Sequence, residues 1–404
     1  MSDQAFLAGA LERVEEYGAF LRRQGCAEGS IKTYRFNCRH FVVWLDQQGV
    51  ALQAIDEGVI ERFAGHRCTC PGMFVRKPRR RSNYLAVIRR FVGYLASVGA
   101  IPNLAWPNQG DDRLAPFGEW LRRHRGTGES TILRHLHIIT NLLLQLGNDP
   151  GRYDAALINR VMLQNLENAS RSGVQHMCGS LRMYLRFLVA NGSCSAALLG
   201  AIPRIPRWRL ATLPRYILHD EVERVIASCD PTTPRGLRNR AILLLLARLA
   251  LRGGDVAKLR LQDIDWDKAL IRVAGKTRYA VALPLPQDVG DALLAYIERA
   301  RPAVAAPEVF IRAYAPFVPF SSSSPITTIV RDALTRAGIE NANVRGAYLL
   351  RHSAATNMLR DGATLDAVGA IMRHRSPETT AIYAKVDTAM LSQVVQPWIG
   401  GAPC

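Results

Sequence analysis

Two segments in the first half of the chain carry apolar residues at the spacing of an α-helix. In each segment these residues fall at positions i, i+3, i+4 and i+7, which predicts one buried stripe per helix. They are Ile88, Phe91, Val92 and Leu95 in the first segment, and Leu181, Tyr184, Leu185 and Leu188 in the second. We therefore expect the aromatic rings of both stripes to lie in a core and not to act as exposed stacking platforms.

These two segments close the two copies of an internal repeat. The first copy begins with YGAFLRRQ at Tyr17 and the second with FGEWLRRH at Phe117, an offset of 100 residues (117 − 17). Each copy continues through a serine, Ser30 or Ser130, and a long helical pattern before its closing helix. The repeat predicts two related helical domains.

The last part of the chain has a different pattern. An apolar helix around residues 242–246 precedes two short β-like runs, ALIRVA and YAVAL, on either side of a GKTR turn, and helical patterns resume at Asp288. Proline-containing connections at residues 101–107 and 202–214 separate the three parts. The expected fold is mainly α with a small β component. We expect helical domains at 1–105 and 112–200, a mixed α/β domain at 214–390 and a C-terminal tail at 391–404.

Charge points to the partner of the chain. Its 404 residues carry a formal net charge of +18, which favours a polyanion such as nucleic acid or an acidic membrane surface. Arginine clusters lie inside amphipathic segments, which favours nucleic acid. The most apolar run, 241–251, is interrupted by Arg248 and is too short to span a membrane. We expect double-stranded DNA, and no membrane, as partner.

A basic connection follows the first half of the first repeat copy. We expect its side chains to contact DNA phosphates, although a solvated loop is an equally good explanation for each residue taken alone. The residues are Arg76, Lys77, Arg79, Arg80 and Arg81.

The beginning of the chain, MSDQAFLAGALERVEE, lacks the basic and apolar regions of a signal peptide, so we expect a cytoplasmic, DNA-associated protein with reduced cysteines. His66, Cys68 and Cys70 in HRCTCPG suggest zinc ligands. No second Cys/His pair follows at the usual finger spacing. We therefore predict no metal site and no cofactor, and interpret these three residues as structural or incidental.

Several residues of the last domain have positions typical of reactive groups. Arg252 follows the apolar helix in LALRGGDVAKL, where Gly253 and Gly254 can stop that helix and Asp255 can cap the next one. This placement exposes a guanidinium, although a cation at a helix end is the more ordinary explanation. Lys276 follows Gly275, but Leu270 stands where a phosphate-binding P-loop needs glycine. A mobile hairpin tip that could reach into a neighbouring groove is the better context for this lysine, although an exposed lysine without a function is the default at such a tip.

Two further segments carry a helix each. In GAYLLRHSAATNMLRDG, Tyr348 and Arg351 lie one turn apart on a predicted helix that ends before Gly362. In MRHRSPETTAIYAK, Pro377 is predicted to be the first helical residue, and Tyr383 is expected on the helix that follows, nine residues (383 − 374) after His374. Each of these residues alone would more often be structural.

Taken together and in this order, these residues resemble the signature of the tyrosine recombinase (phage integrase) family. The resemblance covers roughly residues 214–387 and includes the phrases LLRHSAATNML, MRHRSPETTAIYA and DIDWDKALIRVAGKTR. It implies an enzyme that cuts and rejoins DNA through a 3′-phosphotyrosine and a Holliday junction, without metal or ATP. It also implies that one or both helical halves are SAM-like DNA-binding domains, with two protomers per site and a tetrameric synapse, alone or with related recombinases.

The resemblance assigns a role to each residue. Arg252 and Arg351 would neutralise the phosphate, Tyr383 would attack it, and Lys276 would protonate the leaving 5′ oxygen. His374 would donate a hydrogen bond to the phosphate, and Asp255 would orient its neighbours.

One position departs from the family pattern. The H-x-x-R box begins with Tyr348 in place of histidine, and a phenol is a far poorer base than imidazole at neutral pH. We expect His352 to point to another helix face, which leaves the base for Tyr383 open. A catalytically impaired DNA-binding relative and a type IB topoisomerase remain alternatives.

Overall fold

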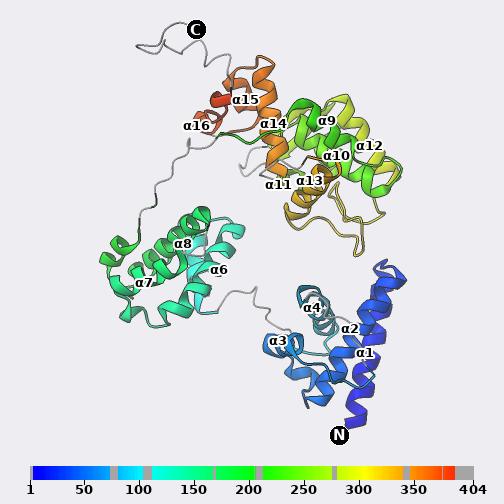
Figure 1. Ribbon diagram of the computed structural model, residues 1–404, viewed down its shortest axis with the longest axis vertical. Coiled ribbons are helices and arrows are strands. Elements are labelled where there is room, and N and C mark those ends of the chain that lie inside the picture. The colour runs from blue at the N-terminus through cyan, green and yellow to red at the C-terminus, as the bar shows by residue number, and fades with distance from the viewer. Residues whose placement is uncertain are drawn as a thin grey trace. The chain divides into compact units, whose positions relative to one another are not determined.

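A computed structural model describes residues 3–72, 81–102, 112–166, 170–203, 205, 213–274, 280–339, 346–374 and 376–386. The chain divides into two compact units, with the main division between Trp208 and Arg209. Figure 1 labels the helices along the chain. The predicted fold class is confirmed, because the described chain is helical apart from one small sheet.

The helices that precede Trp208 follow the order of the sequence repeat. The first copy forms α1 (Asp3–Arg23), α2 (Glu28–Gln47), α3 (Glu57–Gly65) and α4 (Arg81–Ser97), and the second forms α5 (Ala115–Arg125), α6 (Glu129–Leu146), α7 (Ala155–Leu166) and α8 (Arg171–Ala190). The predicted stripe residues of α4 and α8 are all buried. Their aromatic rings belong to the core, as their spacing predicts.

Short 3-10 helices connect several of these elements. They are η1 (Leu52–Ala54), η2 (Asp112–Leu114), η3 (Pro150–Arg152) and η4 (Ala196–Ala201).

The second unit is built around the apolar helix α10 (Pro234–Arg248). Residues 241–246 are at most 1% exposed on every face, because α9 (His219–Ala227), α12 (Gln287–Arg299) and α14 (Ala347–Arg360) all pack against this helix. The remaining helical elements are α11 (Gly253–Ala257), η5 (Leu261–Asp263), α13 (Ser324–Arg336), α15 (Leu365–Ile371), α16 (Pro377–Thr380) and η6 (Tyr383–Val386).

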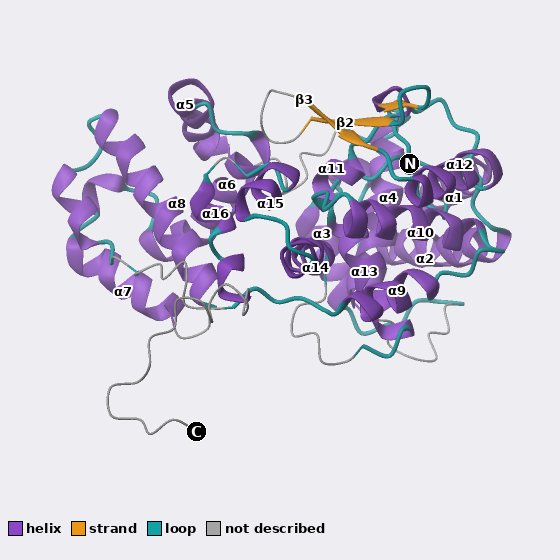
Figure 2. Ribbon diagram, turned by 90° about the horizontal axis from the view of Figure 1, so that it is seen from above, coloured by secondary structure: helices purple, strands orange, loops and turns teal. Residues whose placement is uncertain are grey.

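The sheet, orange in Figure 2, is antiparallel with the order β1-β2-β3. Strands β2 (Leu270–Ala274) and β3 (Ala280–Pro284) form the predicted hairpin, with Ala274 paired to Ala280. Strand β1 (Ile264–Asp265), which the sequence pattern does not predict, pairs with the other side of β2. Among the described residues, no helix is both long and apolar enough to cross a membrane.

Candidate active site

Tyr383 is a buried residue at the start of η6. Its side chain is among the largest that the fold encloses, with 1% of the residue exposed. The phenol oxygen lies 2.6 Å from Nδ1 of His352, and the two rings are 5.6 Å apart between centroids. Pro377 does begin a helix, as predicted, but α16 is only four residues long. Tyr383 therefore stands in the following single-turn 3-10 helix and not in α16 itself.

His352 does not point away from the site, so that expectation is wrong. On an α-helix both the i+3 and the i+4 neighbour of a residue lie on its face. Arg351 is the i+3 neighbour of Tyr348 and His352 is the i+4 neighbour, and the rings of Tyr348 and His352 are 5.8 Å apart. Helix α14 thus offers both an imidazole and a guanidinium to Tyr383.

Two predicted arginines meet at one backbone carbonyl. Arg351, which is 2% exposed, donates to the carbonyl oxygens of Ala250 and Met372. Arg252 donates to the same Met372 oxygen over 3.5 Å and to the Arg373 oxygen over 3.2 Å. The structure therefore brings Arg252 and Arg351 together from segments 99 residues (351 − 252) apart.

The turn that precedes Arg252 is made by a different residue from the glycines that the sequence suggests. Helix α10 ends at Arg248, and Ala250 turns the chain with a positive φ of 47°. Gly253 lies in the first turn of α11, where an added Cβ would come within 3.1 Å of the Ala347 Cβ. The glycine thus permits the close approach of α11 to α14, and it is this approach that places Arg252 beside Arg351.

Asp255 also differs from its predicted role as a cap. Arg252 occupies the cap position of α11, and Asp255 lies in the first turn without capping it. The Asp255 carboxylate instead accepts a hydrogen bond of 2.7 Å from Arg373 and lies 3.9 Å from Arg252. It thus lies close to two guanidiniums, and its function of orienting them stays a prediction.

Arg373 is a site residue that sequence reasoning missed. Its backbone has a positive φ of 52°, and its side chain is only 8% exposed. Its Nη2 atom donates to Asp255, whereas its Nε and Nη1 atoms are buried without a hydrogen-bond partner among the described residues. One signal could have pointed to it: the dipeptide Arg-His occurs at both 351–352 and 373–374, directly within the signature.

His374 stands beside the tyrosine. Its ring is nearly parallel to that of Tyr383, at 5° and with centroids 6.4 Å apart. Its Nδ1 atom lies 2.9 Å from Oγ1 of Thr380, a residue of α16 that is 3% exposed. When the Thr380 hydroxyl donates this bond, Nε2 carries the hydrogen and is available as a donor.

Burial and the arginines control protonation here. Burial raises the pKa of Tyr383 to about 12, although Arg351 acts in the opposite direction. Burial and the nearby Arg351 and Arg252 lower the pKa of His374 to about 4, and burial and Arg351 lower that of His352. The phenol and both imidazoles are thus neutral at pH 7. Beside them lie three guanidiniums, of which only Arg373 and Arg252 face the Asp255 carboxylate, and such an excess of positive charge is suited to an anion.

Other predicted residues are not joined to this cluster. Tyr348 is 58% exposed and touches the site through the ring of His352. Lys276 belongs to the β2–β3 connection, whose residues 275–279 lie outside the described part of the chain. The basic residues Arg76, Lys77, Arg79 and Arg80 are also outside it, and Arg81 enters only as the first residue of α4.

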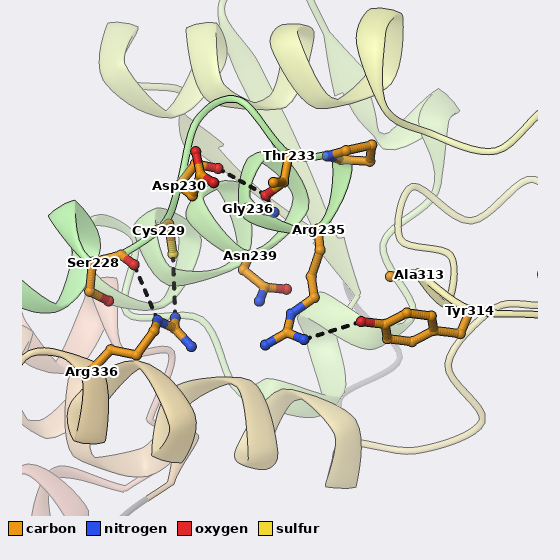
Figure 3. A pocket seen from close by; sticks show the side chains of 11 residues that line it. Ser228, Cys229, Asp230, Thr233, Arg235, Gly236, Asn239, Ala313, Tyr314 and Arg336 are labelled. Atoms are coloured by element: carbon orange, nitrogen blue, oxygen red, sulfur yellow. Dashed lines mark hydrogen bonds between the residues drawn. The ribbon is translucent and has the colours of Figure 1, made fainter.

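A separate pocket of about 450 Å³ lies elsewhere in the second unit (Figure 3). Arg235 donates to the Tyr314 hydroxyl at 3.2 Å on one side, and Arg336 donates to the Ser228 carbonyl at 3.1 Å on another. None of the signature residues lines it. Its arginines are engaged in contacts with the protein itself, so this pocket is not the site of the chemistry.

Comparisons with known proteins identify the family of the chain. The model of the phage integrase family matches residues 215–390. A protein of Sinorhizobium fredii described as integrase/recombinase y4rA is 33% identical over 370 residues, which cover 90% of this chain and 88% of the relative.

Two solved structures share the fold. The XerH site-specific recombinase bound to palindromic difH substrate, in a post-cleavage complex, has a TM-score of 0.52 at 16% identity and covers 98% of this chain and 97% of its own. A lambda integrase dimer bound to a COC′ core site has a TM-score of 0.54 at 15% identity and covers 67% and 94%. The sequence relatives confirm the resemblance drawn from the signature residues: the chain belongs to the tyrosine recombinase (phage integrase) family of enzymes.

Proposed function

We propose that this enzyme cuts and rejoins double-stranded DNA at specific sites through a covalent 3′-phosphotyrosine on Tyr383. The observation that carries the proposal is the convergence of a buried phenol with a cationic cluster. The members of this cluster are Arg252, Arg351 and Arg373, with His374 beside the phenol. Guanidiniums bind phosphate oxygens in a planar, bidentate manner, so two of them can neutralise the charge that builds up on a phosphodiester under attack.

The proposed reaction conserves the energy of the phosphodiester. The Tyr383 oxygen forms a bond to phosphorus while the bond from phosphorus to the 5′ oxygen breaks, and Lys276 gives a proton to that oxygen. Rejoining reverses these steps with the 5′ hydroxyl of another strand. No ATP is required, since the phosphotyrosine retains the energy. No metal is required, since the guanidiniums supply the positive charge.

His352 supplies the base that the sequence left open. A neutral imidazole nitrogen 2.6 Å from the phenol oxygen is within reach of the proton that Tyr383 must lose. We thus assign to His352 the function of general base, for which the phenol of Tyr348 is poorly suited. His374 donates from Nε2 to a phosphate oxygen, and Asp255 holds Arg373 and Arg252 in place.

The assembly is also part of the proposal. We infer that the helical halves 1–105 and 112–200 act as SAM-like domains that clamp DNA together with the catalytic domain 214–390, and that residues 391–404 form a tail. Two protomers on each site and a tetrameric synapse with a Holliday junction follow the practice of the family. The two DNA-bound relatives with the same fold support the DNA partner.

A second candidate is a catalytically impaired relative that only binds DNA. The observation in its favour is Tyr348, which is 58% exposed and stands in the histidine position of the signature. The convergence of Arg252, Arg351 and His374 near Tyr383 argues against it.

One experiment separates the two candidates. The protein is incubated, with and without EDTA, with a nicked half-site whose cleaved strand end diffuses away, so that covalent protein–DNA adducts accumulate. We expect an adduct in both cases and none with Tyr383→Phe, which should still bind the DNA. An adduct formed by the Phe variant would contradict the proposal, and binding without any wild-type adduct would favour the impaired relative.

A further inference from the structure

We infer a structural zinc site in the first helical repeat, formed by His40, His66, Cys68 and Cys70. Sequence analysis predicts no metal here because HRCTCPG lacks a second pair of ligands. The fold supplies the missing ligand from an unexpected place: His40 on α2, which lies 26 residues (66 − 40) before His66. The inference does not depend on the proposed recombinase reaction.

The four donor atoms lie close enough together to bind one ion. One ligand atom from each residue lies within 4.8 Å of all the others. The Sγ atom of Cys68 is 3.2 Å from Nε2 of His40, and that of Cys70 is 3.8 Å from Nε2 of His66. Zinc–sulfur bonds of about 2.3 Å and zinc–nitrogen bonds of about 2.05 Å at tetrahedral angles require sulfur–nitrogen separations of about 3.6 Å. The two observed separations lie on either side of this value.

Each imidazole is held by its other nitrogen in the orientation that a metal ligand needs. Nδ1 of His66 donates to the Phe63 carbonyl, which leaves a lone pair on Nε2. Nδ1 of His40 lies 2.6 Å from the Tyr84 hydroxyl, which can accept from it in the same way. A carbonyl or hydroxyl behind a ligating imidazole is the usual way in which proteins fix the tautomer and the ring. Both Nε2 atoms consequently face the thiols.

The surroundings fit a structural and not a catalytic metal. Aromatic rings pack around the imidazoles: Phe63 is stacked on His66 at 4.9 Å and meets His40 edge-on at 5.2 Å. With all four positions supplied by protein, no position remains open for substrate. His40 and Cys70 are buried, whereas Cys68 is exposed, so an ion can enter from the side of Cys68.

The site also explains a difference between the two repeat copies. Four residues, 167–170, join α7 to α8, whereas fifteen residues, 66–80, separate α3 from α4. The candidate ligands occupy the beginning of this longer connection. Thr140 stands at the position that corresponds to His40, so the second copy lacks the anchor. A metal would attach the connection to α2 and α3, where the shorter one of the second copy needs no attachment.

The first test is direct. The full-length chain, purified under reducing conditions, is depleted of metal and titrated with Co²⁺ and then Zn²⁺. We expect one Co²⁺ per chain, the intense visible bands of a tetrahedral ion with thiolate charge-transfer absorption, and displacement by one equivalent of Zn²⁺. A weak octahedral cobalt spectrum, or no tight binding, would overturn the inference.

Variants assign the ligands. Zinc content by mass spectrometry should fall from about one per chain to near zero in Cys68→Ser/Cys70→Ser and in His40→Ala, and should stay at one in the matched control Cys194→Ser. Because a ligand variant can misfold, Cys70→His is included; it retains four potential ligands, and it should keep zinc but lose part of the cobalt charge-transfer band. Full zinc retention by the double serine variant, or loss in the Cys194 control, would refute the assignment.

Discussion

Replacing His352 tests how the phenol of Tyr383 loses its proton. A phenol with a pKa of about 12 is ionised in only about one molecule in 10⁵ at pH 7, which corresponds to about 7 kcal/mol. His352 is the neutral group at 2.6 Å that can accept this proton. The expected result for His352→Phe is therefore slower formation of the covalent adduct.

Two effects compete in this variant, and their magnitudes decide the outcome. The hydrogen bond to His352 holds Tyr383 in its buried position, so losing it would release the phenol and favour cleavage by about 1 kcal/mol, or about fivefold. Losing a general base costs about 10²-fold to 10⁴-fold. The net expectation is a rate at least about 20 times slower than that of the wild type.

The assay is single-turnover adduct formation on the nicked half-site, with DNA affinity and thermal unfolding as controls. His352→Gln retains an acceptor for the phenol but no base at neutral pH, so it should be slow as well. A fluorinated tyrosine at position 383 has a lower phenol pKa and should partly restore the rate of the Gln variant. A Phe variant that cleaves as fast as the wild type, or faster, would show that His352 only holds the tyrosine in place.

Four further outcomes are expected. Arg351→Lys replaces a planar donor that binds two carbonyls with a point charge, and should reduce single-turnover cleavage by about 10²-fold to 10³-fold while DNA binding survives. The pKa of His374 in the folded protein is lowered to about 4, so the unfolded chain binds a proton more readily at this residue. The free energy of unfolding should therefore be unaffected by His374 above about pH 6.5 and should decrease as the pH falls toward 4. In melting curves this decrease should be smaller for His374→Gln. DNA affinity measured against salt should fall by about 0.9 in log K per log salt for each neutralised phosphate, and a nearly flat dependence would exclude a phosphate clamp. Tyr348→Phe should cleave more slowly than the wild type, and an unchanged rate would mean that this phenol only packs against His352.

Periodicity and turn residues in the sequence predicted those helices and strands whose positions depend on local sequence alone. The stripe of α8, the β2–β3 hairpin and the end of α14 before Gly362 are all marked by periodicity or by turn residues, and the structure has them where the sequence places them. Gly362 adopts a positive φ of 91°, which is the conformation that glycine at a helix end provides. These signals need no knowledge of tertiary contacts.

The wrong predictions concern residues that are distant in the sequence and meet only in the folded structure. Gly253 and Gly254 looked like a helix stop, but the turn is made by Ala250, a residue type that rarely adopts positive φ. The glycine instead serves a close approach between two helices, which only the packed structure reveals. His40 likewise has no local feature that connects it with HRCTCPG, because its partners lie on the far side of α3 in the sequence.

Backbone strain at the site explains how Arg351 is fixed before substrate arrives. A residue other than glycine at positive φ costs about 1–2 kcal/mol, and the second unit has such residues at Ala250 and Arg373. The two carbonyls that accept from Arg351 belong to Ala250 itself and to Met372, which directly precedes Arg373. The strained turns therefore aim acceptors at the buried guanidinium and leave its remaining N–H groups for a ligand. Among the described residues, Asp255 faces Arg373 and Arg252, whereas Arg351 donates to backbone carbonyls. The phosphodiester of the proposed reaction would therefore reduce the repulsion among the three guanidiniums. In the proposed reaction the unbalanced charge is thus a cost of the DNA-free state that binding of the phosphodiester offsets, while the strained turns hold the guanidinium in place.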